Sequence, residues 1–342
     1  LRTRLGYETP AWNGFKALVE GENVTALSDR YNSTTNGQTT YPTVLDPETT
    51  ELNRAQVSWT GARAGVVLGR QRIVLGNARF VGNVGFRQNE QTFDAVKAAF
   101  KVTPDTTLTW VYVDRVHRIF GDDSPQGEWD SDSHLVQMET KTPVGQLTAY
   151  GYLLDFKTAP LQSSATWGVR LTGARPLASG PSLTWEVEYA RQGDYGANTA
   201  DFDLDYLALS VGLKKDARYV SVSLERLDGN GVRGFGTPLA TLHAFNGWAD
   251  VFLTTPASGL TDLNLKAGTT LAIGPRKLRL AAAVHDFNDA DGGLDYGREI
   301  DASATLPLTP KLSFELKAAR FTGDTPAFAD RTKVWVTLEL KL

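Results

Sequence analysis

The sequence predicts an all-β protein, a transmembrane antiparallel β-barrel of about 18 strands, of which about 17 lie within these 342 residues. Three observations predict this fold. Apolar and polar residues alternate along most of the chain, short and long connections take turns, and the polar face mixes charged with small residues. No charge-free apolar stretch reaches the roughly 18 residues of a transmembrane helix.

The alternation is clearest between residues 183 and 190, where Leu183, Trp185, Val187 and Tyr189 share one face. Successive side chains of a strand point to opposite faces, so this period indicates a strand with one apolar face. The same pattern recurs in residues 220–225, 278–285, 312–319 and 334–341. We therefore expect strands from Leu1–Tyr7 at the start to Thr332–Leu342 at the end.

Two kinds of connection separate these strands. The short ones have turn chemistry and lie at residues 103–105, 143–145, 178–181, 274–276 and 309–311. The long ones are polar and lie at residues 28–50, 121–133, 192–201, 228–259, 288–295 and 322–331. This alternation is typical of barrels with short periplasmic turns and long extracellular loops. We expect residues 231–257 to fold inward as a constriction.

A soluble all-β protein is the alternative, since sandwiches and propellers also repeat short alternating strands. The face that carries the charges is also rich in Gly, Ser, Thr and Tyr, which suits a water-filled lumen better than a solvated exterior. We interpret residues 1–342 as one outer-membrane barrel domain. Because 17 is odd, we expect an eighteenth strand upstream of Leu1.

Composition excludes several classes of protein. The net charge of -4 offers no basic surface for nucleic acid, and the absence of cysteine excludes disulfides and thiolate metal sites. We predict no cofactor and no metal-ligating residue. Two acidic loops leave a Ca²⁺ site, a lipopolysaccharide contact or a plain solvated surface open; the first contains Asp122, Asp123, Glu128, Asp130 and Asp132, and the second Asp286, Asp289, Asp291 and Asp295.

Several blocks of sequence carry a family resemblance. They are residues 1–7 (LRTRLGY) with Gly14-Phe15, 68–72 (LGRQR), Arg79-Phe80, 87–94 (RQNEQTFD), 114–121 (DRVHRIFG), 285–287 (HDF) and 295–297 (DYG). In these blocks the chain resembles the alginate-export family of outer-membrane barrels. The resemblance implies an eighteen-stranded channel, which in the best-known member conducts a polyanionic uronate polysaccharide.

Candidate pore-lining residues are mostly arginines, because a guanidinium group matches a carboxylate with two parallel hydrogen bonds. The candidates are Arg70, Arg72, Arg79, Arg87, Arg115, Arg170, Lys266 and His285. Alternation through Leu68 would point Arg70 and Arg72 toward lipid, so we expect either a position at the rim or a bulge at Gly69 that turns them inward. Binding of lipid headgroups or pairing with loop carboxylates is the alternative.

The predicted function is passive diffusion of hydrophilic solutes, saccharides or sugar acids, alginate-like oligouronates and polyuronates among them, through a monomeric channel in the bacterial outer membrane. Its expected partners are outer-membrane lipids, lipopolysaccharide and these solutes. Mixed charges on the lumen face favour neutral or weakly charged sugars. The alternatives are a loop-plugged receptor or structural barrel and, more weakly, a membrane-embedded hydrolase. We predict no catalytic residue, since Ser133 and His134 point to opposite faces of a strand.

Overall fold

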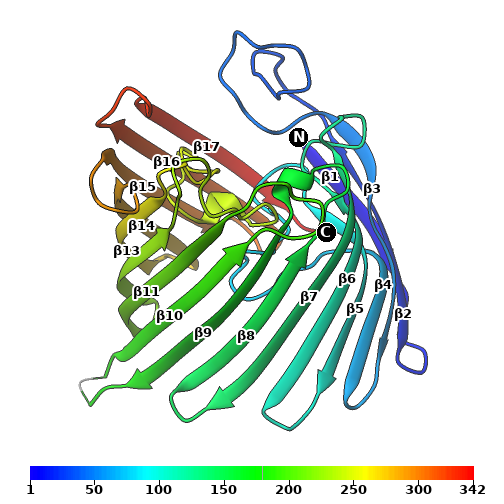
Figure 1. Cartoon of the computed structure of the whole chain (residues 1–342). Helices are drawn as coiled ribbons and strands as arrows, with labels where there is room; N and C mark the ends of the chain where they lie inside the picture. Colours follow the sequence, from blue (N-terminus) through cyan, green and yellow to red (C-terminus); the bar gives the residue numbers. More distant parts are fainter. Residues whose placement is uncertain (179) are drawn as a thin grey trace.

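The computed structural model describes residues 1–178 and 180–342 and folds them into one sheet of 17 antiparallel strands (Figure 1). The strands are β1 (Arg2–Glu8), β2 (Phe15–Val24), β3 (Thr49–Thr60), β4 (Ala64–Gln71), β5 (Thr92–Lys101), β6 (Thr106–His117), β7 (Glu128–Thr142), β8 (Gly145–Leu154), β9 (Ser164–Pro176), β10 (Ser182–Gly193), β11 (Asp203–Lys215), β12 (Arg218–Leu227), β13 (Leu260–Ile273), β14 (Arg276–Asn288), β15 (Asp295–Pro307), β16 (Leu312–Gly323) and β17 (Arg331–Leu340). The predicted all-β fold class and strand number are confirmed.

Each strand pairs with the next one along the chain, and the short connections gather at one end of the barrel and the long ones at the other (Figure 1). The predicted alternation is therefore confirmed, although the turn at 178–181 includes Ser179, which lies outside the described residues. Two further long connections, residues 72–91 and 155–163, were not predicted. Within the described residues no ladder joins β1 to β17, and the eighteenth strand stays a prediction.

The two faces of the sheet differ as the alternation predicts. On β13, Leu263 and Leu265 are exposed on the outer, apolar face, whereas Asp262 and Asn264 are buried on the inner face. Ile300 on β15 is exposed in the same way between the buried Glu299 and Asp301. The charged face is thus the lumen face. The two short 3-10 helices among the described residues are neither long nor apolar enough to cross a membrane.

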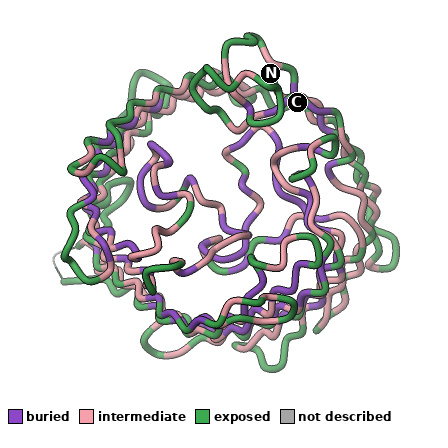
Figure 2. The backbone as a smooth tube through the Cα atoms, turned by 45° about the horizontal axis from the view of Figure 1, so that its top comes forward, coloured by how far each residue is buried: buried purple, intermediate pink, exposed green. Residues whose placement is uncertain are grey.

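The interior of the barrel contains a packed apolar cluster. Two long connections supply its centre, with Ile73 and Val81 from residues 72–91 and Phe235 and Leu239 from residues 228–259, all fully buried. Figure 2 shows buried segments inside the ring of strands. The prediction that residues 231–257 fold inward is confirmed, and the lumen is narrower than a ring of strands alone would leave it.

Candidate functional site

The β4–β5 segment (residues 72–91) crosses the lumen. Arg79 carries its guanidinium to the opposite wall, where Nε donates to Glu225 Oε1 on β12 at 2.6 Å. Its Nη2 donates to Asn246 Oδ1 at 3.1 Å. Arg79 is 2% exposed, so its charge is neutralised and withdrawn from water. Arg79 therefore fixes the segment in place.

The β12–β13 segment (residues 228–259) binds the wall formed by β15 to β17. Its backbone N–H groups donate to lumen carboxylates, from Trp248 to Asp301 at 3.2 Å and from Ala249 to Glu299 at 2.7 Å. The two inward segments also bind each other, because Gly82 N donates to Leu239 O at 2.8 Å. Each inward segment is therefore bound both to the barrel wall and to the other inward segment.

Asp250 is the centre of a buried ionic group, here called the Asp250 cluster, with Arg87, His243, Lys317 and Lys333. Arg87 Nη2 lies 3.0 Å and Lys333 Nζ 2.8 Å from Asp250 Oδ2. His243 Nδ1 donates to Asp250 Oδ1 at 2.7 Å, and His243 Nε2 accepts from Lys317 Nζ at 2.7 Å. His243 is thus a neutral relay between an anion and a cation.

Burial and neighbouring charges set the pKa values in this loop. Burial alone would raise the pKa of Asp250, but the hydrogen bond from His243 and the positive charges of Arg87 and Lys333 outweigh it and hold the pKa well below its usual range. Burial, assisted by the charges of Lys317 and Arg87, lowers the pKa of His243. Both shifts favour the charge states that keep the cluster bound at neutral pH.

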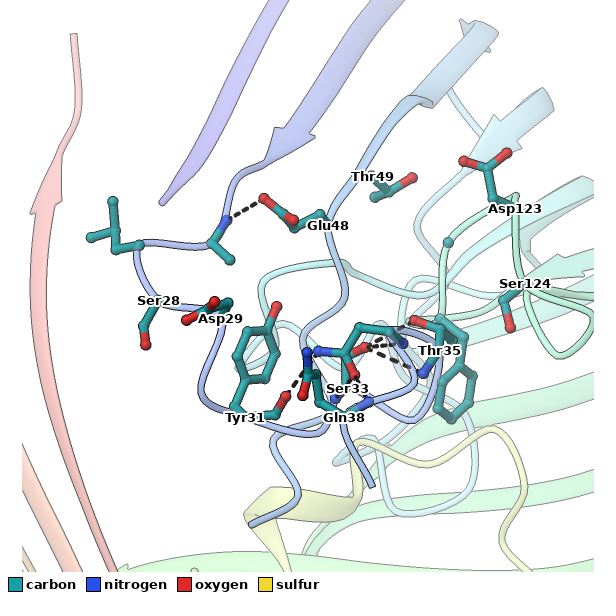
Figure 3. Close-up of a pocket in the computed structure, with 15 residues that line it drawn as sticks. Ser28, Asp29, Tyr31, Ser33, Thr35, Gln38, Glu48, Thr49, Asp123 and Ser124 are labelled. Atoms are coloured by element: carbon teal, nitrogen blue, oxygen red, sulfur yellow. Dashed lines mark hydrogen bonds between the residues drawn. The ribbon is translucent and has the colours of Figure 1, made fainter. Parts of the chain in front are cut away.

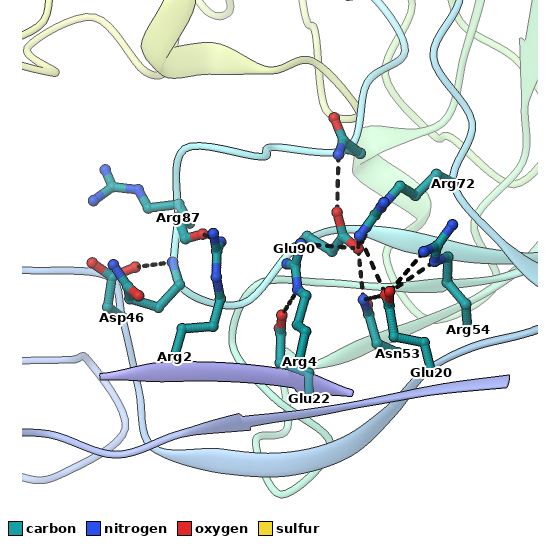
Figure 4. Close-up of polar contacts among 12 residues, drawn as sticks. Arg2, Arg4, Glu20, Glu22, Asp46, Asn53, Arg54, Arg72, Arg87 and Glu90 are labelled. Carbon is teal, nitrogen blue, oxygen red and sulfur yellow. Dashed lines mark hydrogen bonds and ion pairs between the residues drawn. The ribbon is translucent and has the colours of Figure 1, made fainter. Parts of the chain in front are cut away.

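Strands β1 to β3 and the two ends of the β4–β5 segment form a second ionic group, the lumen charge cluster, in which Arg4, Arg54 and Arg72 alternate with Glu20, Glu22 and Glu90 (Figure 4). Arg54 donates two hydrogen bonds to Glu20, at 3.0 and 2.7 Å, in the bidentate geometry that suits a carboxylate. Arg72 lies 2.5 Å from Glu90 and 3.3 Å from Glu20. Arg54 and Arg72 keep 19% and 31% of their side chains exposed, so water reaches both.

Three other predicted residues also lie on the lumen face. Arg170 binds Glu186 at 2.6 Å. His285 is buried and donates to Asp262 at 2.8 Å, a hydrogen-bonding role rather than that of a free base. Lys266 lines a cavity of about 150 Å³ and has no ion-pair partner among the described residues.

Arg70 and Arg115 point away from the lumen. On β5, Phe93 and Ala95 are buried inside the barrel, so Asp94 between them faces outward, and Arg70 binds Asp94 at 2.9 Å. Arg115 binds Asp130 at 3.1 Å. The ladders show no register shift at Gly69, and Arg70 is the last residue but one of β4, next to the β4–β5 segment.

Arg72 reaches the lumen by another route. It follows Gln71, the last residue of β4, and enters the inward β4–β5 segment, so no bulge is needed. Gly69 has φ +107, and a Cβ there would lie 2.3 Å from the Ala55 carbonyl oxygen, which explains the glycine.

A pocket of about 610 Å³ lies between the long β2–β3 and β6–β7 connections (Figure 3). The β2–β3 connection contributes Tyr31, Ser33 and Glu48, and the β6–β7 connection contributes Asp123 and Ser124. Serine, threonine and carboxylate oxygens dominate the labelled lining. Leu27 and Phe120 add apolar surface to the lining, so the pocket can hold a solute that has both polar and apolar parts.

Ser133 and His134, the neighbours considered for a hydrolase, have separate partners in the structure. Ser133 is buried and its Oγ is bonded to Ser131 Oγ at 2.7 Å and to Asp155 N at 2.9 Å. His134 stacks against Trp110 and Tyr112. The prediction that this pair points to opposite faces is consistent with these separate partners.

Sequence reasoning missed Glu225, Asn246 and Asp250 as partners of Arg79 and Arg87, and His243 as a partner of Asp250. Each becomes a partner only when a connection returns to a wall far away in the sequence. The β4–β5 segment had one local signal, the turn-forming pairs Gly76-Asn77 and Gly82-Asn83 inside a stretch that otherwise resembles a strand.

No protein family matches the chain, and no curated protein is similar to it in sequence. Solved structures are similar in fold. OccAB4 of Acinetobacter baumannii has a TM-score of 0.70 and 15% identity over 99% of this chain and 90% of its own. OpdK of Pseudomonas aeruginosa, crystallised with vanillate, has a TM-score of 0.72 and 12% identity over 100% and 92%. OccK9 (OpdG) of the same organism has a TM-score of 0.72 and 14% identity over 100% and 90%. The chain has the fold of these barrels, and the likeness does not single out the alginate-export family.

Proposed function

We propose that this chain is a porin-like channel of the bacterial outer membrane that passes small hydrophilic solutes by diffusion. The observation that carries the proposal is the partial exposure of Arg54 and Arg72 inside a barrel that two inward segments narrow. A channel requires groups that bind a solute weakly enough to release it, and guanidiniums shared between carboxylates and water meet that requirement. The likeness in fold to OccAB4, OpdK and OccK9 supports it.

The proposed solutes are sugar acids and other small carboxylates. Neutral sugars would also pass, but the channel would select for them less than for carboxylates. Guanidinium forks recognise carboxylates, and OpdK was crystallised with vanillate, itself a small carboxylate. The lumen charge cluster contains as many glutamates as arginines, so it offers no continuous cationic track for a long polyanion. Short oligouronates, to which the resemblance to the alginate-export family points, belong to the same class.

A loop-plugged receptor is the second candidate function. The observation that favours it is the apolar cluster inside the barrel, where Val81 and Leu239 are completely buried. Such a cluster excludes water from that part of the lumen. The two candidates differ in one measurable property, because only the channel conducts ions.

Planar-bilayer recordings of the purified chain test both candidates. We expect steady single-channel conductance that glucuronate reduces more than glucose does, and a smaller effect of glucuronate in the Arg54→Gln/Arg72→Gln double variant. Arg276→Gln, in the turn-end region of β14, is the matched control and should behave as the parent. A silent bilayer with folded protein would overturn the channel, and equal effects of glucuronate and glucose would overturn the carboxylate preference.

A further inference from the structure

A compact group of ionisable side chains lies at the base of the β6–β7 connection, outside the lumen. His117 is the last residue of β6, Glu128 is the first residue of β7, and Asp122 lies between them. Their ligand atoms all lie within 4.8 Å of one another. None of the three takes part in the lumen charge cluster or the Asp250 cluster.

The imidazole of His117 is held with one nitrogen facing the carboxylates. Its side chain is 4% exposed, and Nε2 lies 2.9 Å from Asp94 Oδ2. Arg70 donates to both oxygens of Asp94, at 2.9 and 3.2 Å, and Asp94 accepts the hydrogen bond from Nε2–H. Nδ1 is therefore the nitrogen that faces Asp122 and Glu128.

Nδ1 has no hydrogen-bond partner among the described residues. It lies 3.0 Å from Glu128 Oε1 and 3.7 Å from Asp122 Oδ1. A buried ring nitrogen and two carboxylate oxygens that converge at these distances offer three ligand atoms to one cation, whose charge would offset that of the carboxylates. Tetrahedral ligands of Zn²⁺, at about 2.1 Å from the metal, lie about 3.4 Å from each other, between the two distances observed.

We propose that His117, Asp122 and Glu128 form a binding site for a divalent transition-metal ion of the Zn²⁺ class. An imidazole nitrogen with two carboxylate oxygens suits such an ion, whereas Ca²⁺ takes oxygen ligands almost alone. Asp94 orients the ligating histidine through its other nitrogen, an arrangement that recurs in zinc proteins. Asp122 and Glu128 keep 43% and 37% of their side chains exposed, which provides an entry path and leaves a coordination position for water.

The ion would close the β6–β7 connection into a ring. That connection lines the 610 Å³ pocket through Asp123 and Ser124, and its Ile119 carbonyl accepts a hydrogen bond from Asn89 of the β4–β5 segment at 3.2 Å. Metal occupancy would therefore fix a loop that touches both the pocket and an inward segment. The site does not depend on the proposed channel function.

Zinc retention by the purified full-length chain in detergent tests the proposal, with bound Zn²⁺ measured by equilibrium dialysis and Co²⁺ used as a visible-absorption probe. We expect one Zn²⁺ per chain and a Co²⁺ spectrum of tetrahedral intensity. Asp94→Asn should weaken binding about 10–100-fold. His117→Gln and Asp122→Asn should weaken it further.

His134→Gln is the matched control, because His134 packs against Trp110 and Tyr112 outside this group. Asp122 lies in the connection, so Asp122→Asn removes a ligand without altering a strand, and the heat-dependent mobility of each variant on a gel verifies its folding. Zn²⁺ that stays bound in His117→Gln and Asp122→Asn alike would overturn the proposal. So would stoichiometric binding of Ca²⁺ without binding of Zn²⁺.

Discussion

The lumen charge cluster and the Asp250 cluster both pair cationic side chains with carboxylates inside one barrel, yet water reaches their arginines very differently. Arg72 of the first cluster keeps 31% of its side chain exposed, whereas Arg87 and Asp250 of the second keep 7% and 1%. The difference comes from the β12–β13 segment, which covers the wall of β15 to β17. Whether an arginine on the lumen face stays hydrated or becomes buried therefore depends on whether an inward segment covers it.

The largest expected effect is that of Asp250→Asn, which keeps the shape of the side chain but leaves Arg87 and Lys333 buried without a counter-charge. Losing one partner of a buried ion pair costs about 3–5 kcal/mol. We expect a decrease of that order in the free energy of unfolding in urea and a larger, noisier single-channel conductance. Asp291→Asn is the control, because its side chain is 90% exposed. Unchanged conductance and stability would show that the Asp250 cluster does not hold the segment.

Two single substitutions, one in each cluster, test this difference between the clusters. Arg72→Gln removes a hydrated charge, so we expect a few-fold shift in the anion-to-cation permeability ratio toward cations. The loss of stability should be smaller than in Arg87→Gln, because the buried Glu90 keeps hydrogen bonds from Asn53 and Asn83. Arg87→Gln removes a buried ion pair with Asp250. We therefore expect a decrease of about 2–4 kcal/mol in the free energy of unfolding and a smaller shift in the permeability ratio. Reversal potentials in a salt gradient and urea titrations separate the two outcomes. If the two variants changed the permeability ratio equally and the unfolding free energy equally, the distinction between a hydrated and a buried arginine would be wrong.

The Asp250 cluster should weaken on acidification in two stages. The pKa of His243 is lowered on folding, so its contribution to stability is complete above its ordinary pKa of about 6.5 and declines as the pH falls below that value. The lowered pKa of Asp250 gives a contribution present above about pH 4 and lost as the pH falls further. Unfolding free energies measured from pH 8 to pH 3 should show both declines. In His243→Asn the first should disappear and the second remain; an unchanged first stage would exclude His243 as its source.

The smallest effect is expected at an ion pair that no inward segment covers. Arg191 on β10 binds Asp203 on β11 with 63% and 54% of the two side chains exposed. Solvent and salt screen such a pair, so Arg191→Gln should leave the urea midpoint and the conductance unchanged within error. A measurable loss of stability would show that exposure in water understates the burial of this region in the membrane.

The site was only partly predictable from the sequence. Arg170 and Lys266 follow from alternation, and both lie on the lumen face. Alternation through Leu68 points Arg70 and Arg72 outward; Arg70, a candidate for the lumen, does face outward and binds Asp94, whereas Arg72 reaches the lumen because it enters the β4–β5 segment. Arg115 was also expected in the lumen, yet it binds Asp130 on the outer side, because the register shift between Val113 and Arg115 in β6 reverses the face of the side chains that follow it.

Alternation with a period of two, turn chemistry and the regular change from short to long connections are local properties, so the residue order by itself determined the barrel, its strand number and its lipid-facing surface. The path of the two long inward segments is not local. Arg79 meets Glu225 across 146 residues, and Arg87 meets Asp250 across 163, through contacts that exist only once the wall has closed around them. Which charges are hydrated and which are buried therefore depended on the folded molecule, because burial of a charge is a property of everything that surrounds it.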